Sequence, residues 1–331
     1  MLGKVTKRLL SISLVSVSIF AMVGCSNSQS SKSSDASNKP AATSSAKNTT
    51  AVLPSDKAPD LSKLKDAPSV EPAKVFDNLY FLGNQFVGAW MVNTSEGIIL
   101  IDSMNNSDDA EKIIVPGIKK LGFDPAKIKY VLVTHGHCDH YGGAKYIQDN
   151  FGAKVLITSV DWSFMEKNLK DRQEAEAAGK DTSKLMPTPP LPTSHTEITD
   201  GQKLTLGDTT ITIVSTPGHT PGCVSLIFPV TDNGAKHMTS IWGGTGLPKS
   251  LEDNKKYESS VDYFNKFTDE SKVDSELSAH PFVDNALERI DTLRKRKSGD
   301  PNPFVLGEEG YKAYMAKMKE FVTNNITKLS K

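Results

Sequence analysis

The chain has 331 residues, 37% of them hydrophobic, and its 39 basic side chains balance 39 acidic ones. This length and composition suit one large domain or two small ones. The balanced charge gives no reason to expect a nucleic-acid partner, because proteins that bind nucleic acids usually present a basic face. A local basic patch remains compatible with this composition.

Residues 1–24 have the pattern of an export signal, with a basic start and a mostly apolar run over 9–23. The run is short for a transmembrane helix, which needs ~20 apolar residues. It ends in Met22-Val-Gly-Cys25, which resembles the lipobox of bacterial lipoproteins. We therefore expect a lipid on Cys25 and a membrane contact through this anchor only, at the outer face of the cytoplasmic membrane. The alternatives are a plain signal peptide, giving a secreted or periplasmic protein, and an uncleaved anchor.

Residues 25–60 are rich in Ser, Ala, Thr, Asn, Lys and Pro and contain few large apolar side chains. Such a segment cannot bury enough surface to offset the entropy of ordering it, so we predict a disordered tether. A catalytic domain then spans 61–331. Its two cysteines, Cys138 and Cys223, are too few for a disulfide framework. We expect small, partly buried side chains there, and a thiol ligand or a bridge is the alternative.

The regular part of the chain alternates strand-like runs with helical patterns. An amphipathic helix begins at the cap Ser107-Asp108-Asp109, and Pro116 is expected to kink it. Strands are predicted at 75–82, 89–93, 97–102, 128–134, 154–158, 203–206, 210–214, 224–229 and 238–242. Further helices are predicted within 141–150, 161–184, 259–268, 286–297 and 309–328, and the proline-rich 186–192 must be extended. This alternation predicts a layered α/β (or α+β) architecture.

A dense histidine cluster follows the strand predicted at 128–134. His135, His137, Asp139 and His140 lie within six positions, and they include three of the seven histidines of the chain. Imidazole nitrogen and carboxylate oxygen are ligands of catalytic zinc, whereas packing rarely gathers side chains that repel one another when protonated. We interpret the cluster as a metal site, with a solvated histidine-rich loop as the alternative.

Two other histidines share this context. His219 follows the strand predicted at 210–214 through a Pro-Gly turn, and His280 follows the short apolar run 273–279. Loops that leave strand ends are the usual place of active sites in α/β proteins, so five of the seven histidines can converge. His195 and His237 lack such a setting, and we expect both to be ordinary surface residues.

With these residues the chain resembles the metallo-β-lactamase superfamily from about residue 75 to the C-terminus. The signature H-x-H-x-D-H is met by residues 135–140, and Gly142-Gly143 and a later Pro-Gly-His follow it. The resemblance implies a four-layer αββα sandwich with two zinc ions at one edge of its sheets. It implies that the first zinc is held by His135, His137 and His219, and the second by Asp139, His140 and His280. Catalysis is expected to involve Asp139, His137 and His219.

One departure from the family narrows the function. Many hydrolases of the superfamily carry an aspartate that bridges both metals, and some β-lactamases carry a cysteine ligand at a similar place. The equivalent segment here, 241–248, has neither, and its third Gly-Gly-x residue is Thr245. The chain is therefore most similar to the histidine-rich subclass of zinc β-lactamases. Lys249 is either a surface residue or a partner of a substrate carboxylate.

The resemblance implies hydrolysis of a small-molecule β-lactam by a monomeric enzyme, in which zinc activates the attacking water. Thr245, Phe86 and Trp90 are candidate substrate-pocket residues, and the two aromatic residues are equally well explained as core residues of the first hairpin. Three alternatives remain: hydrolysis of another ester, lactone or thioester by the same fold, a substrate-binding lipoprotein, and a purely structural zinc site.

Overall fold

The computed structural model describes residues 67–331. The predicted signal peptide, the lipidated Cys25 and the tether over 25–60 lie outside the described residues and stay predictions. Within 67–331, no helix combines the length and apolar character needed to cross a membrane.

Seven strands form the first sheet, and their spatial order is their order in the chain. They are β1 (Ala73–Phe76), β2 (Leu79–Gly83), β3 (Gly88–Thr94), β4 (Gly97–Ile101), β5 (Ile128–Leu132), β6 (Lys154–Ile157) and β7 (Thr196–Glu197). The pairs from β1 to β4 are antiparallel, and those from β4 to β7 are parallel. The parallel part requires crossover connections, which is where the helices of this half lie.

The second sheet has five strands in the order β12-β11-β10-β9-β8. They are β8 (Lys203–Leu206), β9 (Thr209–Ser215), β10 (Val224–Asp232), β11 (Ala235–Ile241) and β12 (Ser275–Leu277). Only the β11–β12 pair is parallel. The helix α6 (Leu251–Ser271) makes the crossover between these two strands.

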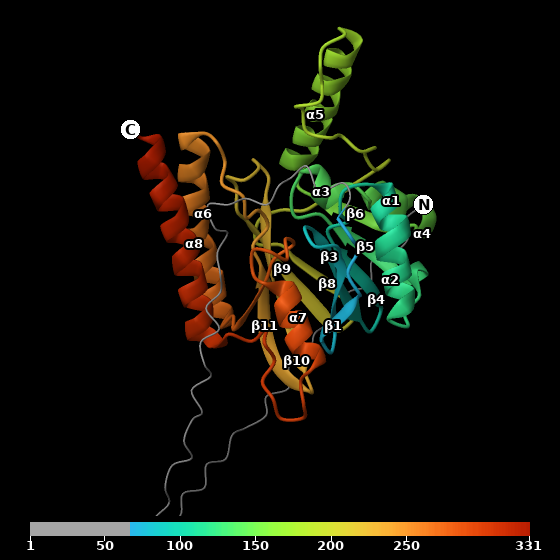
Figure 1. The fold of residues 1–331 in the computed structure, drawn as a ribbon, viewed down its shortest axis with the longest axis vertical. Coiled ribbons are helices and arrows are strands. Elements are labelled where there is room, and N and C mark those ends of the chain that lie inside the picture. The colour runs from blue at the N-terminus through green and yellow to red at the C-terminus, as the bar shows by residue number, and fades with distance from the viewer. Residues whose placement is uncertain (1–66) are drawn as a thin grey trace, which may run out of the picture. The chain divides into compact units, whose positions relative to one another are not determined.

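Helices cover the outer faces of both sheets (Figure 1). Those against the first sheet are α1 (Ser107–Asp109), the π-helical η2 (Ala110–Ile114), α2 (Val115–Lys120), the 3₁₀ turn η3 (Pro125–Lys127), α3 (Cys138–Tyr141) and α4 (Ala144–Phe151). The second sheet is covered by α6 and α8 (Gly307–Leu329), while α7 (Ala286–Arg294) packs near β1. The helix α5 (Ser159–Ala177) projects beyond the layers (Figure 1). The predicted αββα sandwich is confirmed.

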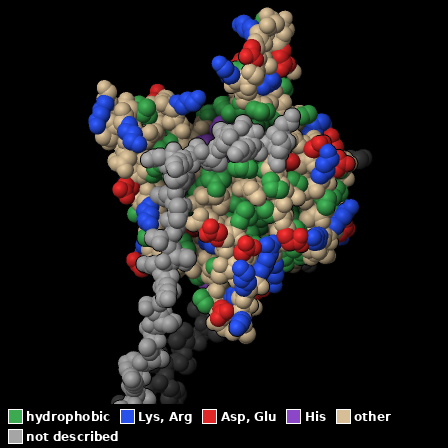
Figure 2. Space-filling view, in the orientation of Figure 1, with side chains coloured by type: hydrophobic (Ala, Val, Ile, Leu, Met, Phe, Trp, Pro, Cys, Tyr) green, Lys and Arg blue, Asp and Glu red, His purple; other side chains and the backbone are tan. Residues whose placement is uncertain are grey.

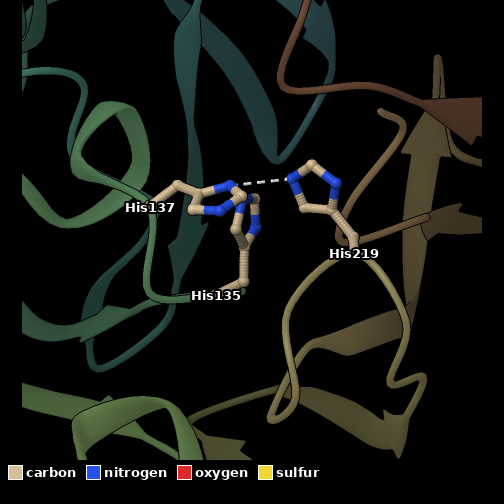
Figure 3. A group of neighbouring side chains, drawn as sticks. All are labelled: His135, His137 and His219. Carbon is tan, nitrogen blue, oxygen red and sulfur yellow. Dashed lines mark hydrogen bonds between the residues drawn. The ribbon is translucent and has the colours of Figure 1, made fainter. Parts of the chain in front are cut away.

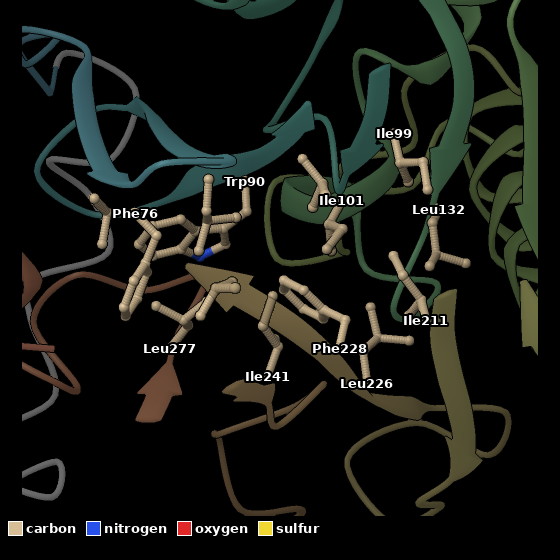
Figure 4. Close-up of a cluster of buried hydrophobic side chains, with 14 of the residues drawn as sticks. Phe76, Trp90, Ile99, Ile101, Leu132, Ile211, Leu226, Phe228, Ile241 and Leu277 are labelled. Carbon is tan, nitrogen blue, oxygen red and sulfur yellow. The ribbon is translucent and has the colours of Figure 1, made fainter. Parts of the chain in front are cut away.

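The main core lies between the two sheets (Figure 4). Trp90 and Ile101 from the first sheet meet Phe228 and Ile241 from the second, and all four side chains are at most 1% exposed. Two further apolar clusters join each sheet to its own helices. Strands of both sheets are therefore buried on two faces, which explains their long apolar runs.

Three predicted elements differ from the structure. The run 75–82 is two strands, β1 and β2, because Asp77 and Asn78 form a turn between them. The helix from Ser107 contains the π-helical turn η2 just before Pro116, whose ring cannot occupy a regular helix interior. The predicted helix over 161–184 ends at Ala177.

The packing of the core lets us predict how far one substitution lowers the free energy of unfolding. Phe228 is fully buried between the sheets, so Phe228→Ala should lower the free energy of unfolding by about 3–5 kcal/mol. Phe282 is 37% exposed, so Phe282→Ala should lower it by much less. Urea denaturation of both variants checks the difference. Equal losses would show that the space between the sheets is not the main core.

Candidate metal centre

Four segments with functional side chains leave the same edge of the two sheets. Asp102 ends β4, His135 follows β5, His219 lies on the loop between β9 and β10, and His280 follows β12. Parallel packing of strand ends gathers these loops in space although they are far apart in the chain. In the space-filling view, histidine surface is visible beside hydrophobic side chains at the base of α5 (Figure 2).

The six predicted ligands lie in the two predicted groups. His135, His137 and His219 offer ligand atoms that lie within 4.8 Å of one another. Their rings converge from two loops that belong to different sheets (Figure 3). The second group, on the same criterion, is Asp139, His140 and His280. The Nε2 atoms of both histidines in this group lie 3.6 Å from Oδ2 of Asp139.

The second ring nitrogen of four histidines is held by the protein. The Nδ1–H of His219 donates to the carbonyl of Gly246 (2.5 Å), and that of His280 donates to the carbonyl of Phe86 (2.8 Å). His140 donates to Oδ2 of Asp102 (2.7 Å), and His135 to Oγ1 of Thr134 (3.1 Å). Each of these bonds leaves the Nε2 lone pair directed at the centre.

Two buried atoms indicate that the site is built for metal. Nε2 of His135 and Nε2 of His140 are fully buried and have no hydrogen-bond partner within 67–331. Buried polar atoms are almost always satisfied, so an orphan pair in one cluster needs an explanation. A cation at each group would satisfy both atoms, and the nitrogen and carboxylate donors suit it chemically.

Burial keeps most of these imidazoles neutral. It lowers the pKa of His137 to about 4 and that of His219 to about 3. Burial also lowers the pKa of His135 and of His280, and the neighbouring imidazoles add to the effect. Neutral imidazole is the form that binds a metal, so these ligands need little proton release at pH 7.

The pKa shifts of Asp139 and His140 favour the charged forms of both side chains. Burial disfavours the charge of Asp139, but His140, His280 and His137 outweigh it and lower its pKa to about 2. Burial likewise opposes protonation of His140, yet the carboxylates of Asp139 and Asp102 raise its pKa. The second group therefore carries an ionised carboxylate across the neutral range.

Asp102 is a functional residue that was missed in the sequence. Its carboxylate accepts bonds from Nδ1 of His140 and from the amide and hydroxyl of Thr134 (2.8–3.0 Å). It thereby orients one histidine of each group, directly or through Thr134. Its φ of 60° lies in the left-handed region, a strained conformation for a residue other than glycine. The available signal was an acid directly after an apolar strand.

The three predicted substrate-pocket residues differ in how deeply they are buried. Trp90 is fully buried, and its Nε1 donates to the carbonyl of Ser278 (3.0 Å), so it is a core residue and the pocket assignment is wrong. Phe86 and Thr245 are half-buried, and their contact with substrate stays a prediction. Lys249 is exposed.

The other histidines and the cysteines lie apart from the two groups. His237 pairs with Asp274 (2.6 Å), His195 stacks on Trp162 (ring centroids 4.0 Å apart), and both are partly exposed. Neither belongs to a ligand group. Cys138 is half-buried and Cys223 is buried, and both are free thiols.

A sequence profile of the metallo-beta-lactamase superfamily matches residues 82–232. The subclass B3 metallo-β-lactamase BJP-1 of Bradyrhizobium japonicum has a similar structure over 80% of this chain and 96% of that one, with 28% identity and a TM-score of 0.62. The chain belongs to the metallo-β-lactamase superfamily. Native FEZ-1 metallo-β-lactamase of Legionella gormanii is likewise similar over 80% and 98%, with 26% identity and a TM-score of 0.67.

Two curated proteins that match the sequence of this chain are not named as β-lactamases. Glyoxylase B2 of Dictyostelium discoideum is 29% identical over 124 residues, which are 36% of this chain and 37% of the relative. The N-acyl homoserine lactonase AttM of Rhizobium radiobacter is 33% identical over 157 residues, which are 43% and 54%. The chain thus spans between 37% and 54% of these relatives. The fold and the two ligand groups are those of a metal-dependent hydrolase of this superfamily.

The buried imidazoles predict acid sensitivity of the metal-free protein. The folded-state pKa values of His137 and His219, about 4 and about 3, lie below the 6.5 of an ordinary histidine. The unfolded chain therefore takes up these protons first, so stability is complete above pH 6.5 and falls as the pH drops from there toward 4 and then 3. Melting of chelator-treated protein checks this, and His137→Gln should melt with a shallower pH dependence. A constant Tm over this window would contradict the neutral cluster.

Proposed function

We propose that this superfamily member is a zinc-dependent β-lactamase. The observation that carries the proposal is the ligand set: five histidines and one aspartate, with neither acid nor cysteine at 241–248. Likeness to BJP-1, described as a subclass B3 metallo-β-lactamase, supports it across 96% of that chain. The substrate would be a small β-lactam.

Zinc suits the donors, because it binds imidazole nitrogen and carboxylate oxygen at open catalytic sites. The residues of the first group would hold one ion, and those of the second group the other. When bound, zinc would supply Lewis acidity at this site: it would lower the pKa of water and polarise the lactam carbonyl.

The protein's own residues orient the imidazole rings and supply a negative charge at this site. Asp139, ionised at neutral pH, can accept a hydrogen bond from the attacking water with one oxygen while the other faces His140 and His280. The acceptors at the Nδ1 atoms fix the tautomers, so the lone pairs stay aimed at the centre. Gly244 leaves room for the ring of His219, since a Cβ at this position would lie 2.5 Å from that imidazole.

Apolar side chains flank both metal groups. The ring centroid of Phe164 lies 5.9 Å from that of His137, and the ring of Phe282 lies 5.4 Å from that of His280. These rings provide an apolar border on either side, which suits the hydrophobic side group of a β-lactam.

A second candidate function is hydrolysis of an ester, lactone or thioester. The specific support is the 33% identity to an N-acyl homoserine lactonase over 157 residues. The same ligand groups serve any of these carbonyl substrates, so the surrounding walls decide between them.

The test is steady-state hydrolysis of a penicillin, a cephalosporin and a carbapenem, with an acyl-homoserine lactone in parallel. We expect β-lactam turnover that is lost on dialysis against a chelator and restored by zinc. Unchanged turnover after chelation would refute the metal mechanism. Lactone turnover without β-lactam turnover would favour the second candidate.

Single ligand variants extend this test. His135→Ala and His280→Ala each remove one ligand of one group, so turnover should drop by orders of magnitude in both. His237→Ala is the matched control, because that histidine lies in β11, pairs with Asp274 and belongs to neither group. Wild-type rates in both ligand variants would remove these residues from the site.

We also propose that Cys25 carries the membrane anchor. Cys25→Ser removes the thiol that would be acylated, so the protein should shift from the membrane fraction to the soluble exported fraction. Immunoblotting of cell fractions measures the shift. Unaltered membrane association of the variant would contradict lipidation at Cys25.

A further inference from the structure

One buried carboxylate outside the two ligand groups lies between their loops. Asp161 is in the first turn of α5, the projecting helix, and it is completely buried. Its amide donates to Oγ1 of Thr158, the N-cap residue of this helix (3.2 Å). The main chain of Asp161 is therefore fixed by helix capping, which leaves its carboxylate free for other contacts.

Three donors, all from loops that carry metal ligands, bind this carboxylate. The amide of Gly136 donates to Oδ2 (2.7 Å), and the hydroxyl of Thr220 donates to the same oxygen (2.6 Å). The amide of Gly222 donates to Oδ1 (2.6 Å). Gly136 lies between His135 and His137, and Thr220 is the residue after His219. One side chain thus holds both backbone segments that supply the first group.

We propose that Asp161 is a positioning residue that sets the spacing between the His135–His137 turn and the His219 loop. The inference rests on the proposed zinc binding at the first group, and it is independent of the substrate. Ligands of a metal must be held within a few tenths of an ångström, and two separate loops do not keep such a distance unaided. A carboxylate that accepts from both loops supplies the missing link.

Burial raises the pKa of the Asp161 carboxyl, and the described part of the chain offers no charged partner that would explain its burial. No basic side chain pairs with it, and its acceptors are used by neutral donors alone. Burying a carboxylate is costly unless hydrogen bonds compensate it, and bonds from amides to a carboxylate are stronger than bonds to a neutral acceptor. A purely structural position of this kind is more cheaply filled by an apolar residue.

The packing around the carboxylate is close on both sides. A Cβ on Gly222 would lie 2.4 Å from Oγ1 of Thr158 and 2.5 Å from the amide nitrogen of Asp161, so only glycine lets the His219 loop approach α5. On the other side, Phe164 lies one turn after Asp161 and contacts both Gly136 and the ring of His137. The first turns of α5 are therefore part of the metal centre.

The experiment compares zinc affinity in two backgrounds. His280→Ala disables the second group, so the remaining zinc reports the first group, and His219→Ala does the reverse. Asp161→Asn is added to each background, since an amide keeps the shape but turns one acceptor into a donor that faces another donor. Competition with a chelator at fixed pH measures the dissociation constant of zinc.

We expect Asp161→Asn to weaken zinc binding about tenfold or more in the His280→Ala background. In the His219→Ala background the affinity should change less than about twofold, because none of the three donors to the Asp161 carboxylate is adjacent in sequence to a ligand of the second group. Equal weakening in both backgrounds would overturn the proposal, since it would indicate a general loss of stability. Unchanged affinity in both would overturn it too.

If Asp161→Asn does not fold, a second pair of less disruptive variants tests the same proposal. Thr220→Val removes one of the three donors and should weaken zinc binding at the first group by a smaller factor in the same direction. Thr216→Val is its control, because that buried hydroxyl lies in the same loop, bonds Ser225 of β10 and does not touch Asp161. If both threonine variants bind zinc alike, the proposal is wrong. Absence of zinc binding by the parent proteins would instead refute the proposed function.

Discussion

The metal centre depends on burying five imidazoles that would repel one another if protonated. Burial alone disfavours their charge, but it also makes every unpartnered nitrogen costly. The protein resolves this conflict by satisfying one nitrogen of four rings from its own side: two carbonyls, one hydroxyl and one carboxylate accept these N–H groups. The nitrogens left over, among them the orphaned Nε2 atoms of His135 and His140, belong to the two ligand groups. A cation at each group would satisfy them.

The two sheets provide the rigidity that this arrangement requires. The ligand loops leave strands whose side chains are buried on both faces, so the loop origins cannot move without disturbing the cores. Asp102 and Met104 both have left-handed backbone here, and the Asp102 carboxylate bonds Thr134 and His140. Such strain persists only where the surroundings over-determine the conformation, and here β4 and β5 hold the flanks of Asp102.

The metal ligands could be predicted from the sequence, but the residues that hold those ligands in place could not. His135, His137, Asp139 and His140 could be recognised because their chemistry is local and their spacing is dense. Asp102 and Asp161 could not, since their partners are amides and hydroxyls of segments that only the fold brings near. The sequence leaves Trp90 open between pocket and core for a related reason: alternation places a residue on a face of a strand but does not say which face meets the second sheet. The layered fold itself followed from the order of strands and helices, whereas β1 and β2 were merged because a two-residue turn carries little signal.

Ligands that are shared across a superfamily cannot by themselves select a substrate, so selectivity must come from the walls around them. In this chain one wall begins with α5, whose first turns are tied to the first metal group through Asp161 and Phe164, while its far end projects from the domain. The helix therefore combines a fixed base with a free end. Changes at the free end can alter what the wall contacts without disturbing the metals, whereas changes at the base alter both together. Such a division would let the contacts with a substrate change while the metal ligands stay in place.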